Sequence, residues 1–431
     1  MKVYCDFHIH SKYSRATSPQ MDIKNLSKYG KLKGLNLIGT GDMTHPIWLK
    51  ELKETLEPME NTGLFTYNGM YFMLTGEIST IYEQGGKIRK IHHNLHVPSF
   101  EIAEQINESL SKHGNLTIDG RPTFSGLTSP EVVEIVTNIS RDCMITPAHI
   151  WTSWFSVFGS KSGFDSIEEC YQDQTKHIFS LETGLSSDTL MNFRISKLDK
   201  YTLLSNSDCH SPFPNRIGRE CNVFNLNKLT YWNIIDAIKR KDSSKFLFTV
   251  EFFPEEGKYH YTGHRKCGVV MHPKEAIRRN NICPVCRKKM TVGVLQRVEE
   301  LADRPEGFIP KKSISFKYSV PLMEIIAENL EIKQIWSKNV WREYYNLIGN
   351  FGNEFNIMFD VPEEELRRKI SEKLVNFILK IRNKDMKWNP GFDGQYGSII
   401  FDKEIVSLQE KKSAKRIKNS GQKKLLDFKG S

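Results

Sequence analysis

The sequence has no hydrophobic run that approaches the roughly 20 apolar residues of a membrane-spanning helix. It also lacks an apolar leader at its start, because the chain enters a strand-like segment at Lys2. The eight cysteines among the 431 residues are scattered, apart from one group of three, and this pattern fits a reducing compartment better than a disulfide framework. We therefore expect a protein of the reducing cytoplasm that does not enter the membrane.

Acidic residues are fewer than basic ones, with 51 Asp and Glu against 61 Lys and Arg, which gives a net charge of +10. This excess modestly favours a polyanionic partner. The hydrophobic fraction of 39% is that of an ordinary globular protein, and 431 residues allow two or three domains. No internal repeat is visible, which gives no indication of a solenoid.

Strand-like and helix-like segments alternate over residues 1 to about 250. Strands are expected at Lys2–Phe7, Gly34–Gly39, Tyr71–Ser79 and Lys87–Val97, with helical stretches between several of them. This alternation predicts an α/β fold of the barrel type, in which the carboxyl ends of the strands carry the chemistry.

The character of the sequence changes near residue 255, and we predict four regions. Residues 1–255 form the α/β domain, and residues 256–300 form a small Cys/His module. Residues 301–405 form an α+β domain whose best helix is Pro362–Arg382, where apolar residues recur at helical spacing. Residues 406–431 form a basic, flexible tail.

Histidines and carboxylates gather at the ends of the expected strands. His8 and His10 point to one side of a strand because side chains alternate, and Asp208 and His210 do the same. The candidate ligands are His8, His10, Asp42, Glu77, His92 or His93, His149, Asp208 and His210. Any one of these histidines is more often an ordinary surface or core residue, but the combination indicates a metal cluster.

The chemistry of this ligand set is that of a catalytic site. Imidazole and carboxylate without thiolate suit Zn²⁺ or Mn²⁺, with Mg²⁺ as an alternative for activity. Two metals bridged by a carboxylate hold a hydroxide at neutral pH and stabilise an in-line phosphoryl displacement. Glu77 is the best bridging candidate. Alternation places Ile91 and Leu95 toward the covering helices and turns His92 inward, which favours His92 over His93.

The ordered motifs His-x-His, Gly-Glu, Pro-Ala-His and Asp-x-His resemble the polymerase-and-histidinol-phosphatase (PHP) superfamily of phosphoesterases. That resemblance implies an irregular (β/α)7 barrel with up to three metals. It implies one metal on His8, His10, Glu77 and Asp208, and a second on Glu77, His149 and the histidine of the 87–97 strand. It implies a third on Asp42 and His210.

Two departures from the motifs of the superfamily weaken the prediction of a third metal site. The stretch after His10 contains no further histidine, and Thr40-Gly41-Asp42 replaces the usual Thr-Asp-His. His45 is a possible extra ligand or proton donor.

The second module reads His264-x-x-Cys267, then Cys283-Pro284-Val285-Cys286. Two such knuckles close a tetrahedral structural zinc site, so we predict a zinc ribbon. His260 and His272 are alternatives for the histidine ligand. A redox Cys-x-x-Cys is the competing interpretation, but it belongs in a thioredoxin-like unit that the sequence does not show. The module is rich in Lys and Arg, which is typical of a solvated face or of a phosphate-contacting one.

The chain closes with the spacing Gln422-x-x-Leu425-x-x-Phe428 after a Lys-rich stretch. This pattern resembles the peptide by which replication and repair proteins bind the sliding clamp (PCNA). Lys429 stands where such peptides often carry a second aromatic residue. The alternative is a basic tail with two incidental apolar residues.

Longer stretches are similar to the endonuclease Q family of archaea, which belongs to the PHP superfamily. These stretches are 147–155, 182–188, 204–212 and 298–305. The resemblance implies a metal-dependent endodeoxyribonuclease that incises double-stranded DNA on the 5′ side of uracil, hypoxanthine, xanthine or an abasic site. Asp208, Glu77 and His210 would be its catalytic residues.

Two rival functions stay open, namely a small-molecule phosphatase and a non-catalytic adaptor for DNA and the clamp. The aromatic residues Tyr13, Trp151, Trp154 and Phe155 either stack on DNA or belong to the core.

Overall fold

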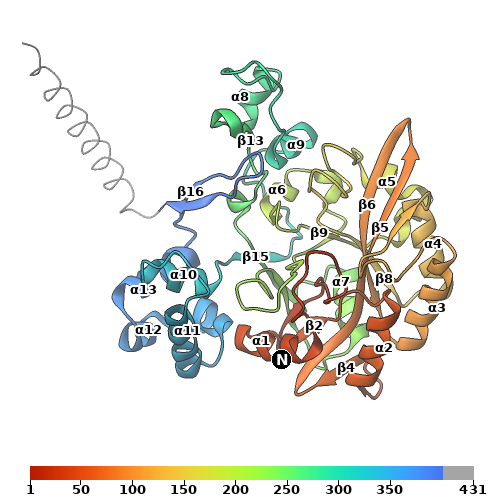
Figure 1. Cartoon of the computed structure of the whole chain (residues 1–431), viewed down its shortest axis with the longest axis horizontal. Helices are drawn as coiled ribbons and strands as arrows, with labels where there is room; N and C mark the ends of the chain where they lie inside the picture. The colour runs from red at the N-terminus through yellow and green to blue at the C-terminus, as the bar shows by residue number, and fades with distance from the viewer. Residues whose placement is uncertain (401–431) are drawn as a thin grey trace, which may run out of the picture.

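A computed structural model describes residues 1–400 (Figure 1). Its main sheet combines parallel and antiparallel pairs, with β1 parallel to β2 and antiparallel to β11. The connected path runs β15 (Ser315–Tyr318), β12 (Phe246–Glu251), β11 (Cys221–Asn225), β1 (Lys2–Asp6), β2 (Leu37–Gly39), β5 (Met70–Gln84), β4 (Leu64–Tyr67) and β3 (Glu57–Met59).

A long antiparallel hairpin of β5 and β6 (Lys87–Val97) dominates one side of the sheet. Its turn is Gly85-Gly86, and both residues have positive φ, as a two-residue hairpin turn of the type I′ class requires. β6 also pairs with β8 (Met144–Pro147), and β5 pairs with β7 (Thr123–Ser125). Through these pairs the hairpin joins β7 and β8 to the main sheet.

Two further strands lie between β8 and the residues that follow β1. β9 (Ser180–Glu182) and β10 (Thr202–Leu204) pair in parallel, and an isolated bridge joins Ile145 to Ile178. Another bridge joins Ile9 to Cys209, where the His10 N–H donates to the Cys209 carbonyl at 3.1 Å. The mixed α/β class is thus confirmed, while the closed (β/α)7 barrel stays a prediction.

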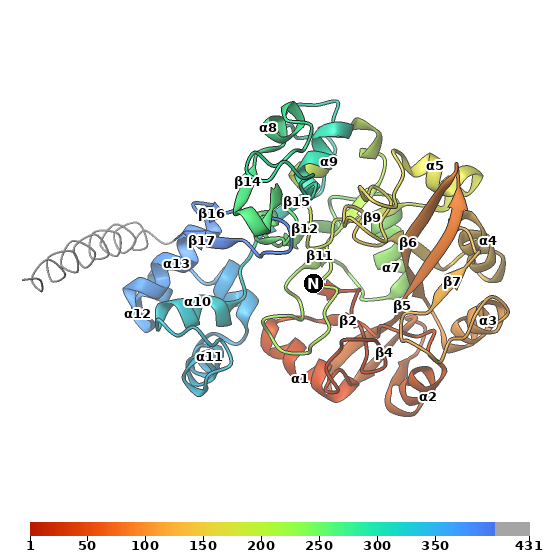
Figure 2. The same ribbon diagram turned by 45° about the horizontal axis from the view of Figure 1, so that its top comes forward.

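Helices cover the outside of this curved sheet (Figure 2). They begin at capping residues that the sequence supplies, such as Thr128, which forms a capping box with Glu131 at the start of α4. The helices of this region are α1 (Ile23–Lys33), α2 (Pro46–Thr55), α3 (Phe100–Ser111), α4 (Ser129–Ile139), α5 (Ile167–Tyr171), α6 (Thr189–Phe193) and α7 (Tyr231–Lys239), with short 3-10 turns η1 (Gln172–His177) and η2 (Ser196–Leu198).

The Cys/His module forms a separate lobe above the sheet in Figure 1, with a small core of its own. Met271, Ala276, Cys283 and Met290 are buried together there. Its elements are β13 (Thr262–His264), η4 (Arg265–Cys267), β14 (Val269–Met271) and α8 (Pro273–Arg278). The turn η3 (Pro254–Glu256) precedes it, and α9 (Val294–Leu301) follows it and packs Val294 and Val298 into the main core.

The C-terminal region is mostly helical and has its own hydrophobic core. Its elements are α10 (Leu322–Asn329), α11 (Lys338–Phe351), the π-helix η5 (Asn356–Asp360), α12 (Glu363–Lys369), α13 (Glu372–Arg382), and the hairpin strands β16 (Lys387–Asn389) and β17 (Ser398–Ile400). The single helix expected over Pro362–Arg382 is wrong. The chain breaks at Ile370, and the Ser371 side chain caps the new helix by accepting from the Leu374 N–H.

Strand pairing and buried polar contacts tie this region to the sheet domain. β15, which precedes the helices, pairs in parallel with β12. Lys33 of α1 donates to Glu354 at 2.6 Å, and both side chains are almost fully buried. The four domain boundaries stay predictions. None of the helices formed by residues 1–400 combines the length and the apolar composition that crossing a bilayer requires.

Candidate metal centre

Four side chains from three parts of the sequence meet at the end of β1. His8 and His10 follow β1, Glu77 lies within β5, and Asp208 follows β10. His10 Nε2 is 3.0 Å from Asp208 Oδ1 and 3.3 Å from Glu77 Oε2. His8 Nε2 is 3.5 Å from the same Asp208 oxygen and 3.6 Å from the same Glu77 oxygen. These four residues, the first ligand set, converge on one point.

A second ligand set uses the other oxygen of Glu77. Glu77 Oε1 lies 2.7 Å from His92 Nδ1 and 3.0 Å from His149 Nε2. His93 points elsewhere, since its Nδ1 is 2.9 Å from the Tyr171 hydroxyl and its Nε2 is 3.2 Å from Thr80 Oγ1. Glu77 is therefore shared by both sets, and the structure brings His92 rather than His93 to it.

The spacing of these donor atoms suits bound divalent cations. Metal–ligand bonds of about 2.1 Å place neighbouring ligands about 3.0 to 3.4 Å apart, depending on whether the geometry is octahedral or tetrahedral. The distances within the two sets run from 2.7 to 3.6 Å. His8 Nε2 is also buried without a hydrogen-bond partner. A buried polar atom aimed at two carboxylates, with no partner of its own, is what a ligand atom provides.

Buried carboxylates hold the histidines from behind. Glu182 lies 3.0 Å from His8 Nδ1 and accepts from the His149 backbone N–H at 2.8 Å. Asp42 lies 3.0 Å from His10 Nδ1 and also accepts from Ser11 and Ser14. A carboxylate at Nδ1 fixes the proton there and leaves Nε2 free to bind a metal.

Charge keeps the shared carboxylate ionised. Burial acts to raise the pKa of Glu77, but His92, Arg121 and His8 outweigh it and hold that pKa well below the usual range. Burial also lowers the pKa of His92 to about 4, although Glu77 acts against this shift. Glu77 is thus a carboxylate, and His92 is a neutral imidazole, at neutral pH. Both are in the protonation states that bind metals.

Three residues of this site have left-handed backbone conformations. Asp42, His149 and Asp208 have φ values of +47°, +29° and +46°. Such conformations cost a non-glycine residue about 1 kcal/mol or more and are found where the surroundings enforce them. Close packing is one such constraint, since a Cβ on Gly120 would lie 2.3 Å from Asp42 Oδ2.

The third set predicted at Asp42 and His210 is not among the groups of three or more candidate ligands that residues 1–400 bring together, and it stays a prediction. Asp42 is fully buried and bound to His10, Ser11 and Ser14, as described above. His210 donates from Nδ1 to the Asp208 carbonyl oxygen at 2.9 Å, and its ring lies 4.5 Å from that of His10. His45 caps α2 and stacks on Tyr13 at 4.5 Å. His210 is thus beside the first set, while His45 has a structural role.

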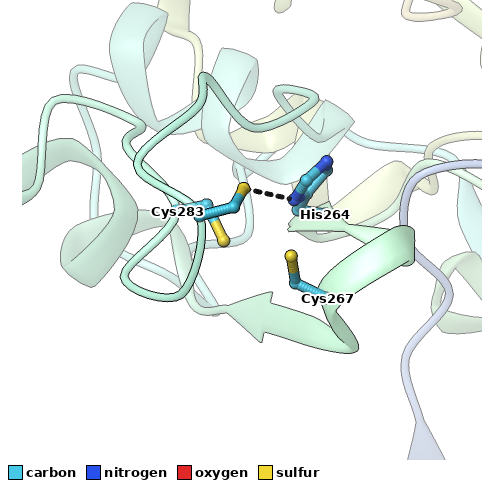
Figure 3. Close-up of side chains that lie close together, drawn as sticks. His264, Cys267 and Cys283 are labelled. Atoms are coloured by element: carbon cyan, nitrogen blue, oxygen red, sulfur yellow. Dashed lines mark hydrogen bonds between the residues drawn. The ribbon is translucent and has the colours of Figure 1, made fainter.

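The Cys/His module brings together His264, Cys267, Cys283 and Cys286. Figure 3 shows His264, Cys267 and Cys283 converging from the two knuckles. Cys286 Sγ lies 3.3 Å from His264 Nδ1. Desolvation raises the pKa of the Cys283 thiol, but the N–H groups of Cys286 and Val285 outweigh it and bring that pKa to about 6.

The lowered thiol pKa favours the thiolate, which is the metal-binding form. The two alternative ligands lie elsewhere. His260 is buried against Tyr261, and His272 caps α8. His264 is therefore the histidine that the geometry places with the three cysteines.

The chain is similar to several known proteins. The family described as the MJ0043 C-terminal domain matches residues 321–385. An uncharacterized protein, MJ0043 of Methanocaldococcus jannaschii, is 34% identical over 263 residues, which are 59% of this chain but 32% of that protein. The chain thus spans about a third of the length of this curated relative.

Two solved structures match nearly the whole chain. The lesion-specific endonuclease PfuEndoQ of Pyrococcus furiosus is 34% identical, with a TM-score of 0.84 over 94% of this chain and 97% of its own. This chain belongs to the endonuclease Q family. An Endonuclease Q solved with a 27-mer duplex carrying an abasic lesion at its active site is 35% identical, with a TM-score of 0.83 over 94% of this chain and 98% of that one.

Two residues of this endonuclease Q site were missed by the sequence analysis. Arg121 donates from Nη1 to Glu77 Oε2 at 3.1 Å, and its side chain is partly exposed. Glu182 lies at the end of β9 and holds His8 and His149. Glu182 begins the stretch 182–188 that resembles the endonuclease Q family, but its residue type alone gives it no role, and Arg121 carries no motif at all.

The aromatic residues near the site divide into two kinds. Trp151 belongs to the core, where its indole donates to Asn192 Oδ1 at 2.8 Å. Phe155 is half-buried with its ring 4.7 Å from that of His92, whereas Trp154 is exposed. Gln422, Leu425 and Phe428, the predicted clamp-binding residues, lie outside the described residues.

Proposed function

We propose that the chain is a metal-dependent DNA repair endonuclease that cleaves the phosphodiester on the 5′ side of a damaged nucleotide. The damage is a deaminated base (uracil, hypoxanthine or xanthine) or an abasic site. The observation that carries this proposal is the shared Glu77, whose two oxygens serve two ligand sets in a chain 34% identical to a lesion-specific endonuclease.

The two sets would hold two divalent metals. His8, His10, Glu77 and Asp208 would bind one, and Glu77, His92 and His149 would bind the other. Zn²⁺ or Mn²⁺ suits this mixture of nitrogen and oxygen donors. When bound, such a pair polarises a phosphoryl group and lowers the pKa of water. The buried carboxylates Glu182 and Asp42 keep the ligand histidines oriented while DNA enters and leaves.

Arg121 and His210 are the residues of the site that would meet the substrate. Arg121 is a permanent cation on Glu77 with 29% of its side chain exposed, so it can bind a phosphate oxygen and neutralise developing charge. His210 has 35% of its side chain exposed, and its Nδ1 is engaged by the Asp208 carbonyl. Its Nε2 is therefore the atom that we assign to proton transfer toward the leaving oxygen.

The other regions would hold the DNA and recruit partners. We propose a structural Zn²⁺ on His264, Cys267, Cys283 and Cys286, with the Lys- and Arg-rich module and residues 301–405 contacting the duplex. The clamp peptide predicted at Gln422, Leu425 and Phe428 would bring the enzyme to the sliding clamp.

The test uses labelled duplexes that carry a single uracil, hypoxanthine, abasic site or normal base. The full chain is incubated with each duplex and with Mg²⁺, Mn²⁺ or Zn²⁺ in turn. We expect a nick that requires the lesion and the metal and that leaves a 3′-hydroxyl. Hydrolysis of phosphomonoesters alone would indicate a phosphatase, and lesion binding without turnover would indicate an adaptor.

A further inference from the structure

Trp154 is the most exposed of the seven tryptophans. It is 52% exposed, against 44% for Trp232 and 39% for Trp336, and Trp48 and Trp151 are buried. Single exposed apolar side chains are common, so the exposure of Trp154 alone assigns no contact, but an indole offers a broad flat face on which a ligand can stack. It lies on the loop that follows β8 and His149, so it is five residues along the chain from the second ligand set.

The loop around Trp154 is fastened to that ligand set. Thr152 Oγ1 lies 3.1 Å from His149 Nδ1 and donates to the Trp154 carbonyl at 2.8 Å. The next residue, Phe155, has φ of +60° and packs its ring 4.7 Å from His92. Its carbonyl accepts from the His92 N–H at 3.2 Å. The backbone beside Trp154 is thus linked to two candidate metal ligands, to His149 through Thr152 and to His92 through Phe155.

A lysine accompanies the indole. Lys90 Nζ lies 5.4 Å from the centre of the Trp154 ring and 5.3 Å from that of Phe155. Lys90 is two residues before His92 on β6, and side chains two apart on a strand share a face. A flat aromatic face and an ammonium group therefore lie together on the side of β6 that carries a metal-ligand candidate.

We propose that Trp154 stacks on a base of the DNA strand beside the metal centre, and that Lys90 contacts the phosphate next to that base. The inference rests on the proposed endonuclease function. Every base offers a π face, so stacking holds an unpaired or extruded nucleotide without reading its sequence. Trp154 is a positioning residue in this account, because it touches DNA but not the reacting atoms.

The test measures binding of the full chain to a duplex that carries a single uracil, in the Asp208→Asn background so that cleavage does not interfere. Trp154→Ala is expected to weaken binding about tenfold to a hundredfold, which corresponds to one lost base stack. Trp154→Phe, which keeps an aromatic face, is expected to restore most of the affinity. Trp232→Ala is the matched control on α7 and is expected to bind like the parent.

Two further readouts separate stacking from a merely structural role. With Asp208 intact, Trp154→Ala should raise KM for lesion DNA much more than it lowers kcat. Lys90→Gln should reduce the salt dependence of binding by about one phosphate contact. Unchanged binding by Trp154→Ala, or an equal loss in Trp154→Phe, overturns the inference even if the wild-type chain nicks lesion DNA. Failure of the wild type to nick any duplex refutes the endonuclease function, while the binding comparison still decides the stacking.

Discussion

The two ligand sets around Glu77 and the Cys/His set of the module are built in opposite ways. His10 and Asp208 are 198 residues apart in sequence and meet only because strands that are remote in sequence end at one place. His264 and Cys286 are 22 residues apart and meet within one small lobe. The first arrangement depends on the whole sheet, and the second is nearly self-contained.

The ligand atoms of the Glu77 cluster and of the Cys/His module also differ. The module presents three thiols and one imidazole, a full tetrahedral complement that leaves no position for a substrate. The Glu77 cluster presents imidazoles and carboxylates, with Arg121 and His210 partly exposed beside it. We infer that the Glu77 cluster serves chemistry and the module serves structure, and each variant below tests that division.

The largest effect is expected from Glu77→Gln, because one substitution removes the carboxylate that both sets share. We expect lesion-dependent nicking to fall about 10³-fold or more. Metal analysis should show loss of the cluster metals, while the zinc of the module is retained. Glu83→Gln is the control, since Glu83 lies on the same strand but is exposed. Near-normal activity of Glu77→Gln would contradict the shared-carboxylate geometry.

Cys283→Ser tests the structural role inferred for the Cys/His module. We expect loss of about one zinc ion per chain and new protease sensitivity within residues 260–291, because the module core is small. The C-terminal hairpin should loosen too, since Asp393 accepts from the Arg265 N–H and the Thr291 hydroxyl, each at 2.6 Å. Hydrolysis of a small activated phosphodiester should persist. Cys143→Ser, which changes a buried cysteine outside the set, should keep the zinc.

The adjacent histidines of β6 give a matched pair for the second ligand set. His92→Gln should lower metal content and reduce nicking by about a hundredfold. His93→Gln should keep the metals, because His93 bonds to Tyr171 and Thr80 instead, and its main effect should be a lower melting temperature. Metal analysis and thermal melting measure both outcomes. Loss of metal in His93→Gln together with retained metal in His92→Gln would contradict the placement of His92 at Glu77.

The smallest of these effects is expected from Glu182→Gln, which leaves every proposed ligand in place. Glu182 orients His8 and His149 from behind. Loss of such a contact typically costs about 10- to 100-fold in metal affinity or activity. Titration of the metal-stripped chain with Mn²⁺ measures the change. Unaltered affinity would mean that the sheet alone fixes these histidines.

Much of the Glu77 cluster could be predicted because its ligands sit at strand ends in recognisable pairs. Strand alternation alone indicates that His92 faces inward, and the structure places it at Glu77. Arg121 and Glu182 could not be found this way, because their contacts arise from packing between segments that have no shared pattern. Asp42 has the right chemistry for a ligand, and the structure shows its Oδ2 accepting from Ser11 and Ser14 and its Oδ1 beside His10, while its role as a ligand stays a prediction.

The C-terminal region shows a different limit. Apolar spacing over Pro362–Arg382 continues through Ile370, so periodicity predicts one helix. The break arises from a capping residue, Ser371, whose side chain starts a second helix at Glu372. A helix start inside a periodic stretch is decided by such a local hydrogen bond, which an apolar pattern does not register.

The most direct test of the account is the Asp208→Asn variant, assayed for binding, bound metal and nicking on one abasic-site duplex. Asp208 belongs to the first ligand set, and it is remote in sequence from the module. We predict that the variant still binds the duplex and keeps the module zinc but does not nick the strand. Retained nicking at a rate near that of the wild type would contradict the assignment of the chemistry to the Glu77 cluster.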